Sequence, residues 1–468
     1  RAARLKQKEC CGTVEEGSAE RLAAPAQSEY FVDFLRQDLL DDPNYGSARV
    51  YGGGLEITTT LDLDFQRAAE EAIATHLPDP AEDPDAALVS IDVESGGILA
   101  MAGGRNWTRD KFNLATFRGG TGRQAGSAFK AFTLTAAIEN DYSLNAVWSG
   151  PPTLGVPGCA DASQPDGIWH PVNAEGSGTG TLLSATANSV NTVFAQLIAQ
   201  LGPEEVVDAA HRMGIRSELP EVCSITLGSV GVNPLEMTNA YATLAARGVY
   251  HEATPYLQVK RPSGRVDRRI LPDPEGKRAV EENVADQVTY ALQGVIQGGT
   301  GSSAAIPPYP AAGKTGSANE NVDAWFCGYT VQIATCVWVG FQEDEIPLVN
   351  INGYSYVYGG TIPAAIWRDY MTVAMDGLDP TPFPTPTLTG SIGPETPVVV
   401  PSPEPEPTES PEPEPTEDPE PEPPPSPDPG PPPSPDPEPP PEEPPGEEEA
   451  QVATLPRRTT VARGRSLS

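Results

Sequence analysis

Segments typical of β-strands stand on both sides of a long helical region in this chain. Before that region, apolar residues alternate over 86–93 and continue over 98–102, and the intervening Ser95-Gly96-Gly97 predicts the turn of a hairpin. Helical patterns then occupy most of 127–300. They are followed by strand patterns at 312–317, 323–330 and 334–341 and by a helical pattern at 366–375. This order predicts an α/β (α+β) fold with one antiparallel sheet flanked by helices.

The helical region opens with the motif Ser127-Ala128-Phe129-Lys130, and apolar spacing predicts a helix from Ser127 to about Tyr142. Residues three apart lie on one face of a helix, so the Lys130 amine is expected to reach the Ser127 hydroxyl. A lysine can take the proton of a serine nucleophile when burial or a second cation lowers its pKa. Alone, the motif is more often a chance Ser-x-x-Lys on an ordinary helix than a catalytic pair.

A second motif, Ser-x-Asn, occurs three times, beginning at Ser143, Ser189 and Ser317. Ser143 stands at the end of the helix already predicted, and Ser317 overlaps the third motif. Ser189 lies in an alanine-rich helical stretch that can return a hydroxyl and an amide to the same cleft. We therefore expect Ser189 to pass a proton and Asn191 to hydrogen-bond the backbone of a substrate.

The third motif, Lys314-Thr315-Gly316, falls in a predicted strand of small residues. A ligand can lie against such a strand as an additional strand, and Gly316 allows its backbone to approach closely. Lys314 is expected to be the cation that lowers the pKa of Lys130, and Lys314 with Thr315 suits the binding of a carboxylate. Together the three motifs predict a serine acyltransferase with a lysine base.

The chain resembles the transpeptidase domain of class A high-molecular-weight penicillin-binding proteins over roughly residues 29–375. Besides the motifs, the resemblance extends to 51–62, 123–126, 227–228, 234–237, 240–242, 323–326 and 359–364. It implies the fold that these transpeptidases share with serine β-lactamases. A small linker subdomain and a disordered tail would accompany that fold.

The resemblance also implies an acylation mechanism. Ser127 would attack the carbonyl between the two terminal D-alanines of a peptidoglycan stem peptide, with Lys130 as general base. The backbone N–H groups of Ser127 and Ser317 would form the oxyanion hole. An amine of a second stem peptide would then take the acyl group and form a cross-link, and β-lactam antibiotics would acylate the same serine.

Roles in leaving-group departure are implied for the other motif residues. Ser189 and Lys314 would pass a proton to the departing D-alanine, and Thr315 with Ser317 would bind its carboxylate. Ser317 and Ala318 stand where the family commonly has threonines. Ala318 therefore lacks a hydroxyl that could assist carboxylate recognition.

Other enzymes and binding proteins share parts of this site. A D-Ala-D-Ala carboxypeptidase uses water as acceptor and is the main alternative. A class A β-lactamase needs a deacylating glutamate in a Glu-x-x-Leu-Asn loop, and the segment 236–239 lacks the leucine. A non-catalytic penicillin sensor would bind without turnover. The resemblance through the linker favours a D,D-transpeptidase.

The resemblance and, for the tail, the composition together imply four parts of the chain. They are a helical remnant at 1–28 that follows a missing glycosyltransferase domain, a linker subdomain at 29–84, the transpeptidase domain at 85–378 and a Pro/Glu-rich disordered tail at 379–468. Of the 53 prolines, 30 lie between 380 and 445, and such a segment cannot bury a core. The full-length protein is expected to be a bifunctional glycosyltransferase/transpeptidase with a membrane anchor, although this chain has no run of about 18 apolar residues.

The net charge of the chain limits the partners that it can bind. The formal net charge is −35, and residues 395–449 contain 18 acidic residues with no Lys or Arg. Nucleic-acid binding is disfavoured, because it requires a basic face. The resemblance implies a location on the extracytoplasmic face of the bacterial membrane or in the cell wall, with the cell-wall synthesis machinery as a candidate partner.

Six cysteines permit two predicted disulfides. Cys327 and Cys336 face each other in the predicted hairpin about 331–332, and Cys159 and Cys223 lie in loop-like segments that could meet. Reduced, buried thiols are the alternative. No metal site is expected, because the four histidines have no i, i+4 partner and no Cys-x-x-Cys is present. The predicted chemistry requires no cofactor.

Overall fold

A computed structural model describes residues 28–394, apart from residues 80, 119, 175–177, 268–272 and 343–344. Residues 1–27 of the expected helical remnant and residues 395–468 of the expected tail lie outside the described residues. Among the helices that the structure describes, none combines the length and the apolar character needed to cross a bilayer.

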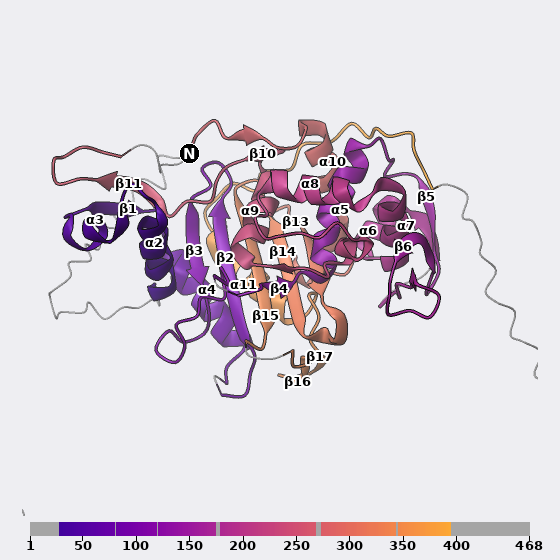
Figure 1. Cartoon of the computed structure of the whole chain (residues 1–468), viewed down its shortest axis with the longest axis horizontal. Helices are drawn as coiled ribbons and strands as arrows, with labels where there is room; N and C mark the ends of the chain where they lie inside the picture. Colours follow the sequence, from indigo (N-terminus) through magenta and orange to yellow (C-terminus); the bar gives the residue numbers. More distant parts are fainter. Residues whose placement is uncertain are drawn as a thin grey trace, which may run out of the picture. The chain divides into compact units, whose positions relative to one another are not determined.

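One antiparallel sheet of five strands lies at the centre of the described domain (Figure 1). Its order is β13 (Ala312–Ser317), β14 (Asp323–Tyr329), β15 (Ile333–Gly340), β2 (Asp85–Asp92) and β3 (Ile98–Ala102). In Figure 1 the purple strands β2 and β3 stand beside the orange strand β15, so strands from both ends of the helical region join. The predicted sheet is confirmed.

Helices cover both faces of this sheet, because alternate side chains of the strands enter two separate cores. Ala87 and Val89 of β2 pack in one core and Ala86 and Leu88 in the other. The first core is completed by α5 (Lys130–Glu139), α6 (Leu182–Ala187), α7 (Asn191–Leu201), α8 (Pro203–Met213), α9 (Pro234–Ala245) and α10 (Glu282–Gln297). The second is completed by α4 (Leu63–His76) and α11 (Ile362–Ala374). Burial on both faces explains why these strands are apolar at consecutive positions.

Short elements connect these layers. The two-stranded pairs are β4 (Arg123–Gln124) with β9 (Gly231–Val232), β5 (Val147–Gly150) with β8 (Gly178–Thr181), β6 (Val156–Ala160) with β7 (Ile168–Trp169), β10 (Val249–Tyr250) with β12 (Lys277–Arg278), and β16 (Val349–Ile351) with β17 (Tyr354–Tyr356). The single 3₁₀ turns are η1 (Gly126–Phe129), η2 (Cys223–Leu227), η3 (Ser302–Ala304) and η4 (Asn319–Asn321).

Two helix predictions need correction at their ends. The helix expected from Ser127 to about Tyr142 is divided into η1 and α5, and it ends near Asp141, whose positive φ breaks the helical path. The last helix begins at Ile362, one turn before the predicted start at 366. Pro363 lies in its first turn, where proline is well tolerated, although in the sequence it reads as a helix breaker.

The segment 29–84 contains two groups of elements. Its first part folds into α2 (Glu29–Asp41), α3 (Gly46–Gly52) and β1 (Glu56–Thr59), and β1 pairs with the distant strand β11 (Tyr256–Lys260). Its last part is α4, which packs against α11 and the sheet within the second core. The predicted boundary at 84 therefore separates α4 from the core to which it belongs.

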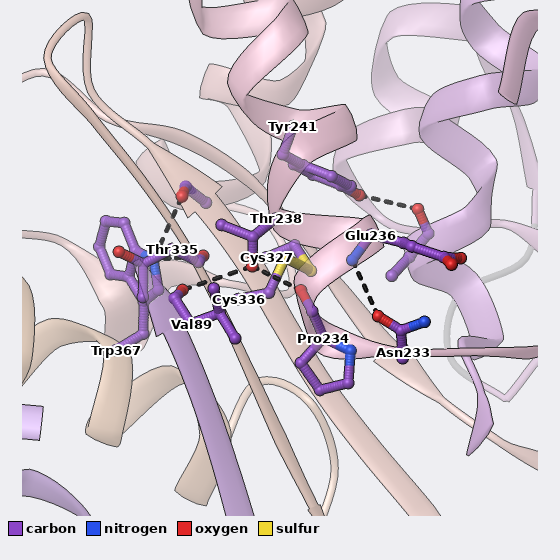
Figure 2. The surroundings of a disulfide bond; sticks show 12 residues. Val89, Asn233, Pro234, Glu236, Thr238, Tyr241, Cys327, Thr335, Cys336 and Trp367 are labelled. Atoms are coloured by element: carbon purple, nitrogen blue, oxygen red, sulfur yellow. Dashed lines mark hydrogen bonds between the residues drawn. A yellow bond between two sulfur atoms is a disulfide. The ribbon is translucent and has the colours of Figure 1, made fainter. Parts of the chain in front are cut away.

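Within the described residues two disulfides are present, with the same pairings as those expected. Cys159 of β6 is joined to Cys223 at the start of η2, which ties the hairpin region after β5 to the first core. Cys327 and Cys336 are directly opposite each other on β14 and β15. Figure 2 shows this second disulfide beside the N-terminal part of α9.

Residues 379–394, which the composition assigned to the disordered tail, have defined contacts on the domain. The Asn283 and Gln287 side chains of α10 each exchange two hydrogen bonds with this segment, at Thr387 and Thr389 respectively. Farther along, the backbone N–H of Ile392 donates to the Asp141 carbonyl. Proline content concealed these polar partners, and the segment ends near β5 (Figure 1).

Replacement of Asn283 by alanine should lower the free energy of unfolding by about 1 kcal/mol, because two hydrogen bonds to Thr387 are lost. Gln297→Ala is the matched control, since Gln297 is exposed on the last turn of the same helix. Urea unfolding of both variants measures the effect. Equal stability of the two variants would show that the contact contributes nothing.

Candidate active site

The Ser127 nucleophile predicted from the sequence lies in η1, directly before α5. Gly126 precedes it with φ +55°, in the left-handed region that favours glycine. A Cβ atom added to Gly126 would lie 2.4 Å from the carbonyl oxygen of Ser317 on β13. Glycine is therefore required for both conformation and space, and the turn that carries Ser127 packs backbone to backbone against the third motif.

Lys130 is the first residue of α5, and its side chain is buried. Its Nζ lies 3.0 Å from Ser127 Oγ and 3.1 Å from Ser189 Oγ. The same nitrogen lies 2.7 Å from the Ser189 carbonyl oxygen and 2.6 Å from Asn191 Oδ1. The amine thus contacts both predicted serines and the predicted asparagine at once.

Burial lowers the pKa of Lys130 well below its ordinary value, and the nearby charge of Lys314 lowers this pKa further. The Phe194 ring, whose centroid is 5.3 Å from Nζ, forms part of the apolar surroundings. Removal of water penalises the ammonium form more than the neutral amine. The site therefore favours a lysine that can accept a proton.

Ser189 does not lie within a helix, as the alanine-rich stretch suggested, but in the turn between α6 and α7. Its φ of +57° is uncommon for a residue with a side chain. This backbone conformation accompanies a side chain that faces two lysines. Its Oγ is 3.1 Å from Lys130 Nζ and 2.8 Å from Lys314 Nζ.

Lys314 and Thr315 occupy neighbouring positions on β13 and are both buried. The Lys314 Nζ also donates to the Thr315 carbonyl oxygen at 3.1 Å. The Thr315 hydroxyl lies 2.7 Å from the hydroxyl of Thr300, a residue that no motif indicated. Third-motif side chains are thus held in place by contacts along the strand and from the segment after α10.

The free edge of β13 faces the turn that carries Ser127. Within the part of the chain that the structure describes, β13 is an edge strand of the sheet. The Ala318 N–H donates to the Asp323 carbonyl, and Ser317 is opposite Ala324. Hydrogen-bonded pairs alternate in an antiparallel ladder, so the Ser317 N–H points away from β14. The Ser317 hydroxyl accepts a hydrogen bond from Gly359 N–H at 3.2 Å.

Asn191 has two partners in the protein. Its Oδ1 accepts from Lys130, and its Nδ2 donates to the Val172 carbonyl at 2.7 Å. The expected role in binding a substrate backbone stays a prediction. Val172, Thr300 and Phe194 are residues of this site that the sequence argument missed, because each contact joins segments far apart in the chain and no spacing reveals it.

Comparison with known proteins now identifies the family. The sequence profile described as "Penicillin binding protein transpeptidase domain" matches residues 86–371. The chain belongs to this family. The chain is 35% identical over 399 residues to penicillin-binding protein 1A of Mycolicibacterium smegmatis, and the match covers 80% of this chain and 48% of that protein. It is 36% identical over 382 residues to penicillin-binding protein 1A of Mycobacterium tuberculosis, covering 76% and 44% respectively.

A solved structure gives the same relationship. The fold of the transpeptidase domain is similar to that of the PonA1 protein from Mycobacterium tuberculosis in complex with penicillin V. The TM-score is 0.67 at 32% identity, and the match covers 79% of this chain and 99% of that one. This chain spans about half the length of the two curated relatives. It is a class A transpeptidase domain related to penicillin-binding protein 1A.

The lowered pKa of Lys130 predicts a pH-dependent cost in stability. At pH values below the ordinary lysine pKa of 10.5, Lys130 binds a proton in the unfolded chain, whereas the folded protein disfavours the charged form. Folding must then release this proton, which lowers the free energy of unfolding. As pH rises toward that value, wild type should gain up to about 1.4 kcal/mol per pH unit relative to Lys130→Met. Urea unfolding at about pH 7 and about pH 9.5 measures the difference.

The exposed residue Lys277 supplies the control for this measurement. A Lys277→Met variant should follow wild type at both pH values, because Lys277 is exposed and lies outside the group of contacts around Lys130. A constant stability difference between wild type and Lys130→Met across the pH range would contradict a neutral Lys130.

Proposed function

We propose that this domain is a serine D,D-transpeptidase that cross-links peptidoglycan stem peptides through a Ser127 acyl-enzyme. The observation that carries the proposal is a continuous line of contacts from Ser127 Oγ through Lys130 Nζ and Ser189 Oγ to Lys314 Nζ. Each step of this line is between 2.8 and 3.1 Å. Such a line can remove a proton from the nucleophile and deliver it to a leaving group.

The hydrogen-bond partners of Lys130 explain how its amine could remove the proton of Ser127. A neutral amine has two N–H donors and one lone pair. The Ser189 carbonyl oxygen and Asn191 Oδ1 can only accept, so they take the two N–H groups. The lone pair then remains for a hydroxyl, and Ser127 Oγ at 3.0 Å is in range to donate its proton.

Departure of the terminal D-alanine needs a proton on its nitrogen. Lys130 receives the proton of Ser127, and the Ser189 hydroxyl lies between Lys130 and Lys314. Ser189 can donate to the leaving nitrogen while it accepts a proton from Lys130. Lys314 assists this transfer, because its ammonium group stabilises the negative charge that develops on Ser189 Oγ.

Substrate binding is proposed along the edge of β13. The outward N–H of Ser317 and the N–H of Ser127 would hold the oxyanion, and the close packing of Gly126 on Ser317 keeps the two groups adjacent. Lys314, with the hydroxyls of Thr315 and Ser317, would bind the carboxylate of the D-alanine. An extended stem peptide would add to this edge as a strand, with Gly316 permitting close approach.

Transfer of the acyl group to an amine distinguishes the proposed reaction from its alternatives. The carboxylate of Glu236, the nearest match to a deacylating glutamate by sequence, accepts hydrogen bonds from the N–H and hydroxyl of Ser217. It therefore serves to anchor that loop, which argues against a β-lactamase. A D-Ala-D-Ala carboxypeptidase remains the second candidate, because its site differs only in the acceptor.

The wider setting follows from the relatives. Because the chain spans about half of penicillin-binding protein 1A from mycobacteria, we place it in a bifunctional glycosyltransferase/transpeptidase at the extracytoplasmic face of the membrane. Peptidoglycan stem peptides and the cell-wall synthesis machinery would be its partners. The relative with bound penicillin V supports β-lactams as inhibitors.

Replacement of Ser127 by alanine should abolish covalent labelling by a fluorescent penicillin, because it removes the hydroxyl that forms the acyl bond. Ser143→Ala is the control, since Ser143 begins another Ser-x-Asn match and lies after α5. Gel fluorescence measures both. Persistent labelling of the Ser127 variant would show that Ser127 is not the nucleophile.

Replacement of Ser189 by alanine should slow acylation by about 10²-fold or more, because the proton path between the lysines is interrupted. Ser184→Ala, an exposed serine on α6, should acylate at the wild-type rate. Stopped-flow labelling measures the rate, and a stem-peptide assay with an added amine separates cross-linked product from hydrolysed product. Hydrolysis alone in that assay would favour the carboxypeptidase.

A further inference from the structure

The segment that leads into the nucleophile is held by an arginine outside the line of catalytic contacts. Arg123 on β4 lies four residues before Ser127. Its guanidinium carbon is 5.5 Å from the centroid of the Trp338 ring and 5.8 Å from that of Phe117. One nitrogen of the guanidinium also donates to the carbonyl oxygens of residues 341 and 342, at 2.7 Å to the former. Arg123 is thus fixed by two rings and two carbonyls.

A buried carboxylate stands behind one of these rings. The Trp338 indole N–H donates to Asp323 Oδ1 at 2.8 Å, and Asp323 is 3% exposed. Burial raises the pKa of Asp323 to about 6, while Arg123 acts to lower it. A carboxylate that accepts from the indole makes the ring a better partner for a cation. Arg123, Trp338 and Asp323 therefore reinforce one another.

These contacts connect the turn that carries Ser127 with the strand that ends at Ser317. Asp323 begins β14, and its carbonyl accepts from Ala318, the residue after Ser317. On the other side, Arg123 continues into residue 124, whose carbonyl accepts from the Trp325 indole at 2.8 Å. After Ala125, the chain continues with Gly126 and Ser127. The turn that presents Ser127 and the strand that ends at Ser317 are thus anchored in one cluster.

We propose that Arg123 is a positioning residue for acylation, which holds the turn before Ser127 so that its hydroxyl meets Lys130 and its N–H stands beside that of Ser317. This inference rests on the proposed acyl-enzyme function. Arg123 acts through the backbone of η1 and not on the substrate. Displacement of a reacting group by about 1 Å can cost about 10²-fold in rate, so a small movement of the turn is enough.

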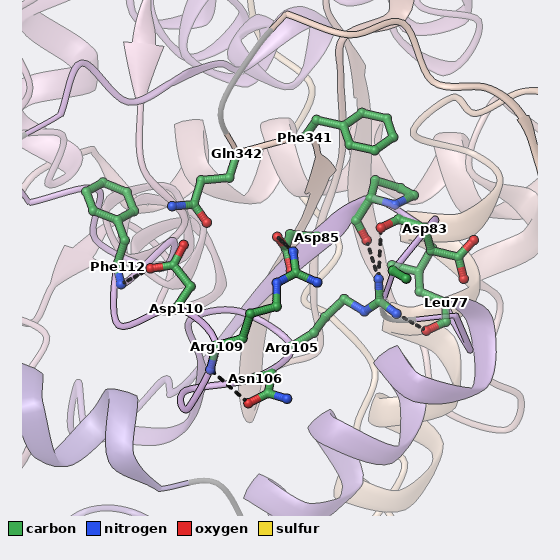
Figure 3. Close-up of polar contacts among 12 residues, drawn as sticks. Leu77, Asp83, Asp85, Arg105, Asn106, Arg109, Asp110, Phe112, Phe341 and Gln342 are labelled. Atoms are coloured by element: carbon green, nitrogen blue, oxygen red, sulfur yellow. Dashed lines mark hydrogen bonds and ion pairs between the residues drawn. The ribbon is translucent and has the colours of Figure 1, made fainter.

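A second half-buried arginine offers a matched control. Arg105 donates to the carbonyl oxygens of Leu77, Asp83 and Pro84, as Figure 3 shows, with residues 341 and 342 nearby. It therefore holds backbone carbonyls as Arg123 does. Its partners, however, lie between α4 and β2, and none belongs to the turn before Ser127. Loss of Arg105 should cost stability without moving the nucleophile.

Acylation kinetics of the full chain with a fluorescent penicillin test the proposal. The rate constant at saturation reports the chemical step, and the half-saturating concentration reports prior binding. Arg123→Ala should lower the saturating rate constant by about 10-fold to 100-fold, with the half-saturating concentration little changed. Arg105→Ala should keep the wild-type rate constant while its melting temperature falls. Arg123→Lys should fall between wild type and Arg123→Ala, because it keeps the charge and loses the planar stacking.

The outcomes are separable. A rate constant for Arg123→Ala within twofold of wild type would overturn the positioning role, as would an equal loss of rate in Arg105→Ala. If Arg123→Ala does not fold, a wild-type rate constant in Arg123→Lys overturns it instead. Absence of labelling in the wild-type protein would contradict the proposed function itself and not the role of Arg123.

Discussion

Two buried lysines around one serine hydroxyl form the arrangement on which the rest of the site depends. The amines of Lys130 and Lys314 both lie within 3.1 Å of Ser189 Oγ, and both side chains are buried. Two ammonium groups in such a place are costly, because each loses its hydration and repels the other. The protein relieves this cost by favouring a neutral Lys130 and by surrounding the amines with oxygen atoms of Ser189, Asn191 and Thr315. This relief would suit Lys130 to the role of general base in the proposed acylation.

The central sheet and α9 support this arrangement. Lys314 is opposite Cys327 on β14, which is in turn opposite and bonded to Cys336 on β15. Above the disulfide, the hydroxyl of Tyr241 donates to the carbonyl of Ala128 in the nucleophile turn at 2.7 Å (Figure 2). One helix therefore contacts both the sheet that carries Lys314 and the turn that carries Ser127. The costly lysine pair is supported by well-packed, fully paired neighbours.

Local chemistry made much of this predictable from the sequence. Alternating apolar residues and turn signals placed the five strands to within one or two residues, and helical spacing placed Lys130 one turn from Ser127. The features that the sequence did not predict depend on contacts between residues far apart in the chain. The left-handed turn at Ser189 and the contact of Thr300 with Thr315 depend on tertiary packing, which overrides local propensity. The ordered segment 379–394 was missed for the same reason, because its partners lie on α10 and after α5.

Asn191 links the Lys130 amine to the backbone of a distant segment of the chain. One side of its amide accepts from Lys130, and the other donates to the carbonyl of Val172. Val172 belongs to the region after β5 that the disulfide at Cys159 ties to η2. A shift of this region would move the amide and with it the partner that occupies one N–H of the catalytic amine. In the proposed mechanism, the position of Val172 and the hydrogen bonding of the Lys130 amine are therefore linked through Asn191.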